Sequence, residues 1–345
     1  MKHLVVGAGA TFAEALAQGN PPERCPPLLR DFALKTWPHV YNPHPVLEAY
    51  LRELGYTDLG SDPRELFYRL ERDGQTNIER FLEFAWIHRD KDWKLEEGAA
   101  APDYISGLRV VAHTETPEEP VPQLAPKWWA DFLYNGIGKP LTLMMSQCFF
   151  ENGRGWKDLN LTKCVASRLD GGDLVLNLNY DTVFELALEQ LNKPFAYSPN
   201  TPTANELTVC KPHGSLNMVM NAEHFTFGQP EWLGMPEPPN FRSYSGFIPP
   251  RLHKRYAQHP ASQVILAPAV NRSPDEIIMW GVGLTESDVE LVDLYRHWSR
   301  HAKRISIINP SEPVARRATD LLGVRVAWFE SVVAWAGIAS NNPVA

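Results

Sequence analysis

Two short polar motifs, each at the end of an apolar run, hold the side chains best suited to chemistry. Asn179-Tyr180-Asp181 follows the expected strand 173–178, and Lys211-Pro212-His213-Gly214-Ser215 begins where the expected strand 208–211 ends. In doubly wound α/β proteins, ligands bind at the carboxyl edge of the sheet, where such runs stop. Amide and carboxylate groups orient a ligand there, and a histidine exchanges protons near neutral pH. The two motifs therefore predict a ligand site, and they favour nucleotide chemistry.

A third feature is a glycine turn near the start of the chain. Gly7-Ala8-Gly9-Ala10-Thr11 follows the apolar run 3–6 and precedes a helical pattern. Such a turn lets backbone N–H groups approach a pyrophosphate at the positive end of a helix. A dinucleotide fingerprint would place a third glycine at Phe12 and an acidic strand end about 20 residues later, and the chain has neither. The turn is thus either a ligand loop or a tight turn, and a hydride-transferring dehydrogenase is not favoured.

Each of these residues also has a purely structural interpretation. Asp181 fits a helix cap and Asn179 a strand-end turn, while an isolated histidine such as His213 is more often structural than catalytic. We expect Glu185, one turn into the following helix, to face a basic group. Weaker candidates end two later strands: Gly281 with Gly283, and Asn309.

The alternation of strand and helix patterns after residue 170 predicts an α/β fold, in which a Rossmann-like parallel sheet carries helices on both faces. Residues 1–45 and 166–345 are expected to form this Rossmann-like domain. Residues 46–165 are expected to form a helical insertion after the first strand region. Further strands are predicted at 223–227, 264–268, 276–282, 304–308 and 324–328, with helices at 287–303 and 312–322.

Composition excludes several classes. The net charge of −8 and the pI near 5.8 argue against binding the phosphate backbone of nucleic acids, and no apolar stretch is long enough to cross a membrane. Met1-Lys2-His3 lacks the basic and apolar regions of a secretory signal, so we expect a cytoplasmic protein. The four cysteines form no C-x-x-C pair, so we expect free thiols and no structural zinc site.

The ordered set of motifs resembles the sirtuin-like fold of NAD-consuming proteins, and most closely the bacterial sirtuin-like domains that hydrolyse NAD in antiphage defence. The set is the glycine turn, Asn-Tyr-Asp, Lys-x-His-Gly-Ser, a small-residue strand end and Ile-Asn-Pro. This resemblance covers roughly residues 1–25 and 170–330. It departs from the family pattern at Asn177-Leu178, which replaces the polar pair that usually precedes Asn-Tyr-Asp.

The resemblance implies a role for each motif. It makes Asn179 a residue that orders water or ribose at the scissile N-glycosidic bond, and His213 the general base. Asp181 would contact the nicotinamide amide, and NAD, as substrate, would be bound by the remaining residues with no metal. These are Gly7, Ala8, Gly9, Ala10, Thr11, Gly214, Ser215, Gly281, Gly283 and Asn309.

The expected reaction is hydrolysis of NAD to nicotinamide and ADP-ribose by a toxic effector of antiphage defence. Sirtuin deacylases typically carry a small zinc module built from paired cysteines, which this chain lacks, so hydrolysis is favoured over NAD-dependent protein deacylation. A non-catalytic nucleotide-binding subunit is the third possibility. Because uncontrolled NAD hydrolysis is harmful, we expect activation by self-association or by a separate sensor or activator protein.

Overall fold

A computed structural model describes residues 1–37, 44–89, 91, 93, 128, 132, 134–151, 154–220, 225–232, 246–247, 256, 260–284 and 288–341. The chain divides into two compact units. The sheet unit consists of Met1–Cys25, Cys148–His213 and Arg255–Ala345. The helical unit consists of Pro26–Gln147 and Gly214–Lys254. Within the described residues, no helix is both long enough and apolar enough to cross a membrane.

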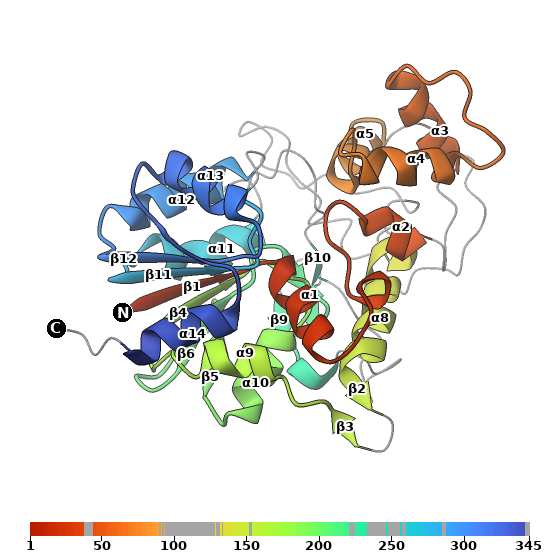
Figure 1. Ribbon diagram of the computed structural model, residues 1–345. Helices are drawn as coiled ribbons and strands as arrows, with labels where there is room; N and C mark the ends of the chain where they lie inside the picture. The colour runs from red at the N-terminus through yellow and green to blue at the C-terminus, as the bar shows by residue number, and fades with distance from the viewer. Residues whose placement is uncertain are drawn as a thin grey trace. The chain divides into compact units, whose positions relative to one another are not determined.

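The sheet unit is built on a seven-stranded, all-parallel sheet with the strand order β13-β12-β11-β1-β4-β6-β5 (Figure 1). Its strands read as nearly continuous apolar runs, as expected for strands buried on both faces. The fold is thus α/β and Rossmann-like, as the sequence predicts. The strands are β1 (Lys2–Val6), β4 (Leu174–Asn177), β5 (Phe195–Tyr197), β6 (Leu207–Cys210), β11 (Glu276–Trp280), β12 (Arg304–Ile308) and β13 (Ala327–Phe329).

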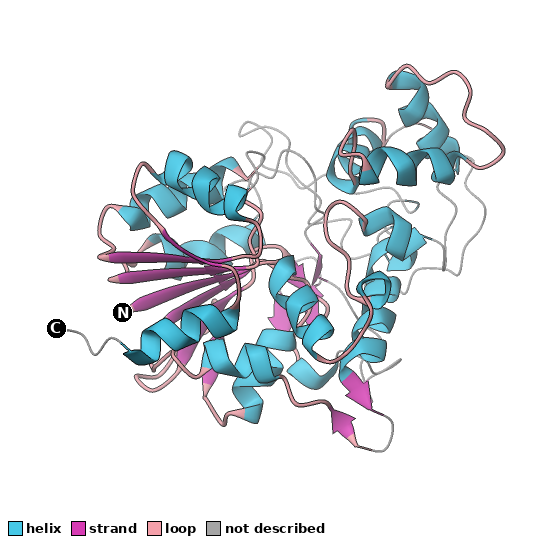
Figure 2. Cartoon of the chain, viewed as in Figure 1, coloured by secondary structure: helices cyan, strands magenta, loops and turns pink. Residues whose placement is uncertain are grey.

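Helices cover both faces of this sheet (Figure 2). One face carries α1 (Ala8–Ala17), α9 (Asn160–Ala166), α10 (Val183–Gln190) and α14 (Val332–Asn341). The opposite face carries α11 (Pro260–Val270), α12 (Val289–Ser299) and α13 (Glu312–Leu322). The chain leaves β1 toward β4 on one side and later crosses to β11 on the other. The topological switch point, where ligands bind in such sheets, therefore lies between the carboxyl ends of β1 and β11.

The helical unit contains α2 (Phe32–Thr36), α3 (His44–Glu53), α4 (Pro63–Arg72), α5 (Ile78–Ile87), a π-helix (Tyr134–Gly138) and most of α8 (Lys139–Phe149). Its core is aromatic: Trp37 is buried, and its ring lies 5.0 Å from that of Phe67 and 5.3 Å from that of Phe81. Helix α4 begins at Pro63, and the side chain of the N-cap residue Asp62 accepts a hydrogen bond from the Arg64 amide.

The remaining elements are short. Two 3₁₀ turns span Pro22–Arg24 and Pro230–Trp232. The small strand pairs are β2 (Phe150–Glu151) with β3 (Gly155–Trp156), β7 (Gly214–Ser215) with β10 (Gly246–Phe247), and β8 (Met218–Met220) with β9 (Phe225–Phe227).

The unit boundaries differ from the expected domains in three places. Residues 26–45 group with the helical unit, where the Ala33 amide donates to Glu71 of α4. Residues 148–165 group with the sheet unit, because α9 packs against α1 and α10. Residues 214–254 leave the sheet unit, since their strands pair with one another.

One expected strand is wrong. Residues 264–268 lie inside α11, whose buried residues Ala261, Ile265 and Ala269 recur at the spacing of one helix face. An apolar run of this length cannot be assigned to a strand or a buried helix by periodicity alone. The expected strand 223–227 is described only from Phe225, as β9, and it pairs with β8 rather than joining the main sheet. The edge strand β5 was not expected.

Candidate functional site

The sheet order places the three main sequence motifs beside one another. Strands β1, β4 and β6 are neighbours, so the glycine turn, Asn-Tyr-Asp and the segment that contains His213 all leave the same edge of the sheet. Both adjacent pairs are parallel, which aligns their carboxyl ends. The adjacency that the sequence only suggested is therefore a consequence of strand order.

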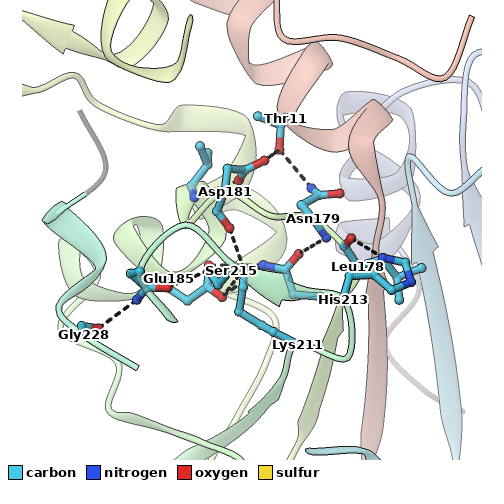
Figure 3. Close-up of polar contacts among 12 residues, drawn as sticks. Thr11, Leu178, Asn179, Asp181, Glu185, Lys211, His213, Ser215 and Gly228 are labelled. Carbon is cyan, nitrogen blue, oxygen red and sulfur yellow. Dashed lines mark hydrogen bonds and ion pairs between the residues drawn. The ribbon is translucent and has the colours of Figure 1, made fainter. Parts of the chain in front are cut away.

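Asn179, Asp181 and Thr11 form a hydrogen-bonded cluster at this edge (Figure 3). The Asn179 amide Nδ2 donates to the Thr11 hydroxyl at 3.0 Å and to the Gly7 carbonyl at 3.1 Å. The Thr11 hydroxyl in turn donates to Asp181 Oδ2 at 2.9 Å. All three side chains are buried. The cluster ties the end of β4 to the first turn of α1.

The carboxylate of Asp181 closes a turn at the start of helix α10. Its Oδ1 accepts from the Val183 amide at 3.0 Å, while Oδ2 is taken by Thr11. Burial raises the pKa of Asp181, opposed by the nearby Lys211 charge and by the hydrogen bonds from Val183 and Thr11. Both carboxylate oxygens thus already have protein partners: one closes a turn at the start of α10, whose N-cap residue is Thr182, and the other holds Thr11.

A buried ion pair holds the segment that carries Asn179 and Asp181. Lys211 Nζ lies 3.2 Å from Glu185 Oε1, and neither side chain has any exposed surface. Lys211 also donates to the backbone carbonyl of Asp181 at 2.5 Å (Figure 3). Asn177 donates to the Glu185 carboxylate at 3.1 Å, and its Oδ1 accepts from the Asn179 amide at 3.0 Å. Glu185 therefore faces a basic group as expected, and Asn177 holds the backbone that presents Asn179.

His213 is fixed through both of its ring nitrogens. Its Nδ1 lies 2.8 Å from the carbonyl oxygen of Leu178, and its Nε2 is hydrogen-bonded to the hydroxyl of Tyr256. A carbonyl only accepts, so Nδ1 carries the proton, and in the neutral imidazole Nε2 has the free electron pair. The Tyr256 ring stacks on the imidazole at an interplanar angle of 16°, and its hydroxyl lies 3.4 Å from Asp288 Oδ1.

The glycines at the switch point pack against one another. A Cβ at Gly281 would lie 2.0 Å from the Ala10 nitrogen, and one at Gly7 would lie 2.6 Å from the Gly281 oxygen. The Gly9 amide donates to the Gly281 carbonyl at 3.0 Å, and the Ala10 amide donates to Gly7. These glycines are therefore required for contact between two loops. The amide of Ala8, the exposed first residue of α1, has no acceptor within the described part of the chain.

The remaining candidates are placed as follows. The Asn309 amide donates to the Val282 carbonyl at 3.3 Å, and its Oδ1 accepts from Ser311. Gly283 is exposed, with nothing within 4 Å of the place of a Cβ. Gly214 and Ser215 belong to the helical unit. There Ser215 donates to Asn217, which donates to the Gly228 carbonyl (Figure 3).

Sequence reasoning missed Tyr256, Asp288 and the role of Asn177. A polar residue closing a buried strand, as Asn177 does, was the available signal for the last. Nothing near Tyr256 or Asp288 in the sequence indicates that either contacts His213, because only the tertiary fold brings them together. Among the described residues, no group of three or more His, Cys, Asp or Glu side chains is placed to hold a metal ion.

Comparison of the sequence with protein-family models and with curated proteins gives no significant match. The fold and the site geometry therefore carry the functional argument.

Proposed function

We propose that the protein is an NAD glycohydrolase that cleaves NAD to nicotinamide and ADP-ribose, with Asn179 and His213 as its catalytic residues. The observation that carries this proposal is the convergence of the two motifs. Asn179 and His213 leave neighbouring strands, and His213 is anchored on the carbonyl of Leu178, the residue directly before Asn179. Two side chains suited to glycosidic hydrolysis thus share one backbone support.

The orientation of Asn179 suits a role in positioning. Its Nδ2 is fully used by Gly7 and Thr11, whereas its Oδ1 has no partner among the described residues. That oxygen is an acceptor for a ribose hydroxyl or for the attacking water. Because two hydrogen bonds fix the amide plane, little conformational freedom is lost when the substrate binds.

His213 supplies the acid–base function in this proposal. Hydrolysis breaks the bond between C1′ and the nicotinamide nitrogen, whose positive charge is neutralised by the departing electron pair. Water adds to C1′ through an oxocarbenium-like transition state and loses a proton. With Nδ1 protonated toward Leu178, Nε2 is the nitrogen that takes up this proton.

The glycine turn offers fewer backbone amides for NAD binding than the sequence predicts. Three of its amides, those of Gly7, Gly9 and Ala10, donate within the protein. The free amide of Ala8 and the positive end of the ten-residue helix α1 remain to meet a phosphate. The switch point between β1 and β11 is the expected place for the dinucleotide.

The direct test is to incubate the protein with NAD and to measure nicotinamide and ADP-ribose, with and without cell extract. We expect Asn179→Ala and His213→Ala each to lower kcat by about 10²-fold or more while the circular dichroism spectrum is retained. Matched controls are Asn200→Ala and His297→Ala, which alter exposed residues of the same unit and should leave hydrolysis unchanged. Undiminished hydrolysis in both site variants would show that the site is misassigned.

The same assay separates the two alternatives. A deacylase would release nicotinamide only when an acyl-peptide is supplied. A non-catalytic binder would be stabilised thermally by NAD without consuming it.

The proposed biological role is that of a toxic effector in antiphage defence, activated by self-association or by a partner. If so, hydrolysis per protomer should rise with protein concentration or on addition of the activator. A rate per protomer that stays constant across concentrations, and that no extract raises, would count against regulated assembly.

A further inference from the structure

The surroundings of His213 raise the question of how a proton reaches it. Nδ1 is committed to the Leu178 carbonyl and Nε2 to the Tyr256 hydroxyl. Tyr256 is 2% exposed and His213 is 8% exposed, so bulk water has little access to either. The electron pair of Nε2 therefore faces the hydroxyl of Tyr256, and a proton can pass to the imidazole through this hydroxyl while both contacts are kept.

We propose that Tyr256 relays the proton from the attacking water to His213, with Asp288 positioning the hydroxyl. This inference rests on the proposed function, because it assigns the proton path of the same hydrolysis. In the resting site the single hydrogen of the Tyr256 hydroxyl lies between two acceptors, Nε2 of His213 and Oδ1 of Asp288, and it is donated to Nε2, which makes the shorter contact. As water attacks C1′, one of its O–H bonds breaks and a new O–H bond forms on Tyr256, while the original hydroxyl proton passes to Nε2.

The contact with Asp288 explains how the relay accommodates the charge. After transfer, the imidazolium donates from Nε2 to the Tyr256 oxygen, so the hydroxyl hydrogen needs another acceptor. Asp288 Oδ1, which lies within hydrogen-bond distance of that hydroxyl at 3.4 Å, is this acceptor. Its negative charge then stabilises the imidazolium through one intervening hydroxyl, as a carboxylate oriented behind a catalytic histidine does.

Stacking of the two rings keeps the relay aligned. The Tyr256 and His213 ring centroids lie 5.5 Å apart and the ring planes are nearly parallel. This packing does not depend on the hydroxyl, so Tyr256→Phe removes the relay atom while keeping the ring. Tyr295 offers a matched control, because it is equally buried in the same unit and its hydroxyl has no partner among the described residues.

The experiment combines kinetics with nitrogen NMR of the imidazole ring. In the parent protein at pH 8, we expect the His213 signals, identified by their loss in His213→Gln, to show a protonated Nδ1 and a bare, hydrogen-bonded Nε2. In Tyr256→Phe, the Nε2 signal should shift to that of a nitrogen without a donor, with Nδ1 unchanged. For NAD hydrolysis, kcat should fall about 10²-fold with KM retained.

The role of Asp288 is tested by the same substitution in the parent protein and in Tyr256→Phe. Asp288→Asn should lower kcat about tenfold in the parent and should have no effect in Tyr256→Phe, because its influence passes through the hydroxyl. Tyr295→Phe should change neither the spectra nor the kinetics. A Tyr256→Phe variant that hydrolyses NAD as fast as the parent overturns the relay. A variant that hydrolyses NAD faster than the parent also overturns it, and shows that the Tyr256 hydroxyl hinders proton uptake by His213.

Failure of this inference is distinguishable from failure of the proposed function. If His213→Ala still hydrolyses NAD, or the parent never does so with any extract, the proposed function fails. The NMR comparison does not need turnover. An Nε2 signal that Tyr256→Phe leaves unchanged overturns the relay in either case.

Discussion

The side chains that support the site at the residue scale are charged rather than apolar. Lys211 and Glu185 are both fully buried, and together they hold the carbonyl of Asp181 and the amide of Asn177. Removing one member of a buried pair leaves an uncompensated charge, which costs far more than the pair contributes. The geometry of Asn179 and Asp181 therefore depends on a pair that contacts no substrate in our proposal.

This dependence gives a stability prediction. Lys211→Met leaves the Glu185 carboxylate buried and unpaired, and the free energy of unfolding should fall by about 3 kcal/mol or more. The double variant Lys211→Met/Glu185→Gln removes the charge and keeps an acceptor for Asn177, so it should be more stable than the single variant. Urea unfolding followed by circular dichroism measures both. A double variant less stable than Lys211→Met would contradict the ion-pair argument.

At the scale of elements, the glycine turn after β1 and the loop after β11 are fitted to each other. Gly281 has a φ of +65°, and a Cβ there would collide with the backbone of Ala10. The helix α1 that carries Thr11 is thus positioned partly by the loop after a strand far away in the sequence. Only glycine permits this approach at that position.

Gly281→Ala should therefore destabilise the sheet unit by about 3 kcal/mol or more, since it combines an unfavourable φ with a backbone clash. Gly283→Ala, two residues later, places its Cβ in open space and should change the free energy of unfolding by less than about 0.5 kcal/mol. Thermal unfolding of the two variants side by side makes the comparison. Equal unfolding midpoints for the two variants would show that the contact between the glycine turn and the loop after β11 does not stabilise the fold.

The same scale shows what sequence reasoning achieved. The strand at Arg304–Ile308 and the helix at Glu312–Leu322 agree with their expected ranges. In each segment the pattern of apolar residues fits one type of element, and the flanking residues mark its ends. The run at 264–268 was misassigned because a short apolar segment fits either a strand or a buried helix. Tyr256 was missed for a different reason, since its contact with His213 depends on the tertiary fold alone.

At the scale of the whole molecule, each unit contains a buried titratable group with a shifted pKa: a histidine, which is a base, in the sheet unit and a glutamate, which is an acid, in the helical unit. His3 in β1 has no exposed surface, and neither ring nitrogen has a hydrogen-bond partner among the described residues. Burial, with smaller contributions from the charges of Arg272 and the N-terminus, lowers the pKa of His3 to about 3. In the helical unit, burial raises the pKa of Glu71 to about 7, against the hydrogen bonds it accepts from Ala33 and Leu34.

Acidity should therefore affect the two units in opposite directions. Because the folded pKa of His3 lies below its unfolded value of 6.5, its contribution is complete above pH 6.5 and is lost as the pH falls toward 3. The folded pKa of Glu71 lies above its unfolded value of 4.5, so its contribution is complete below pH 4.5 and is lost as the pH rises toward 7. Each effect amounts to about 1.4 kcal/mol per pH unit within its window.

Hydrogen exchange with mass spectrometry, resolved by peptide at pH 5 and pH 7.5, tests this at the level of each unit. After correction for the intrinsic exchange rate, protection of the sheet unit should be weaker at pH 5 in the parent, and His3→Leu should reduce that difference. Protection of the helical unit should be weaker at pH 7.5, and Glu71→Gln should reduce that difference. His297→Ala, which alters an exposed histidine on α12, serves as the control. If neither substitution alters the pH dependence of its own unit, these buried groups do not set it, and each unit must owe its response to other side chains.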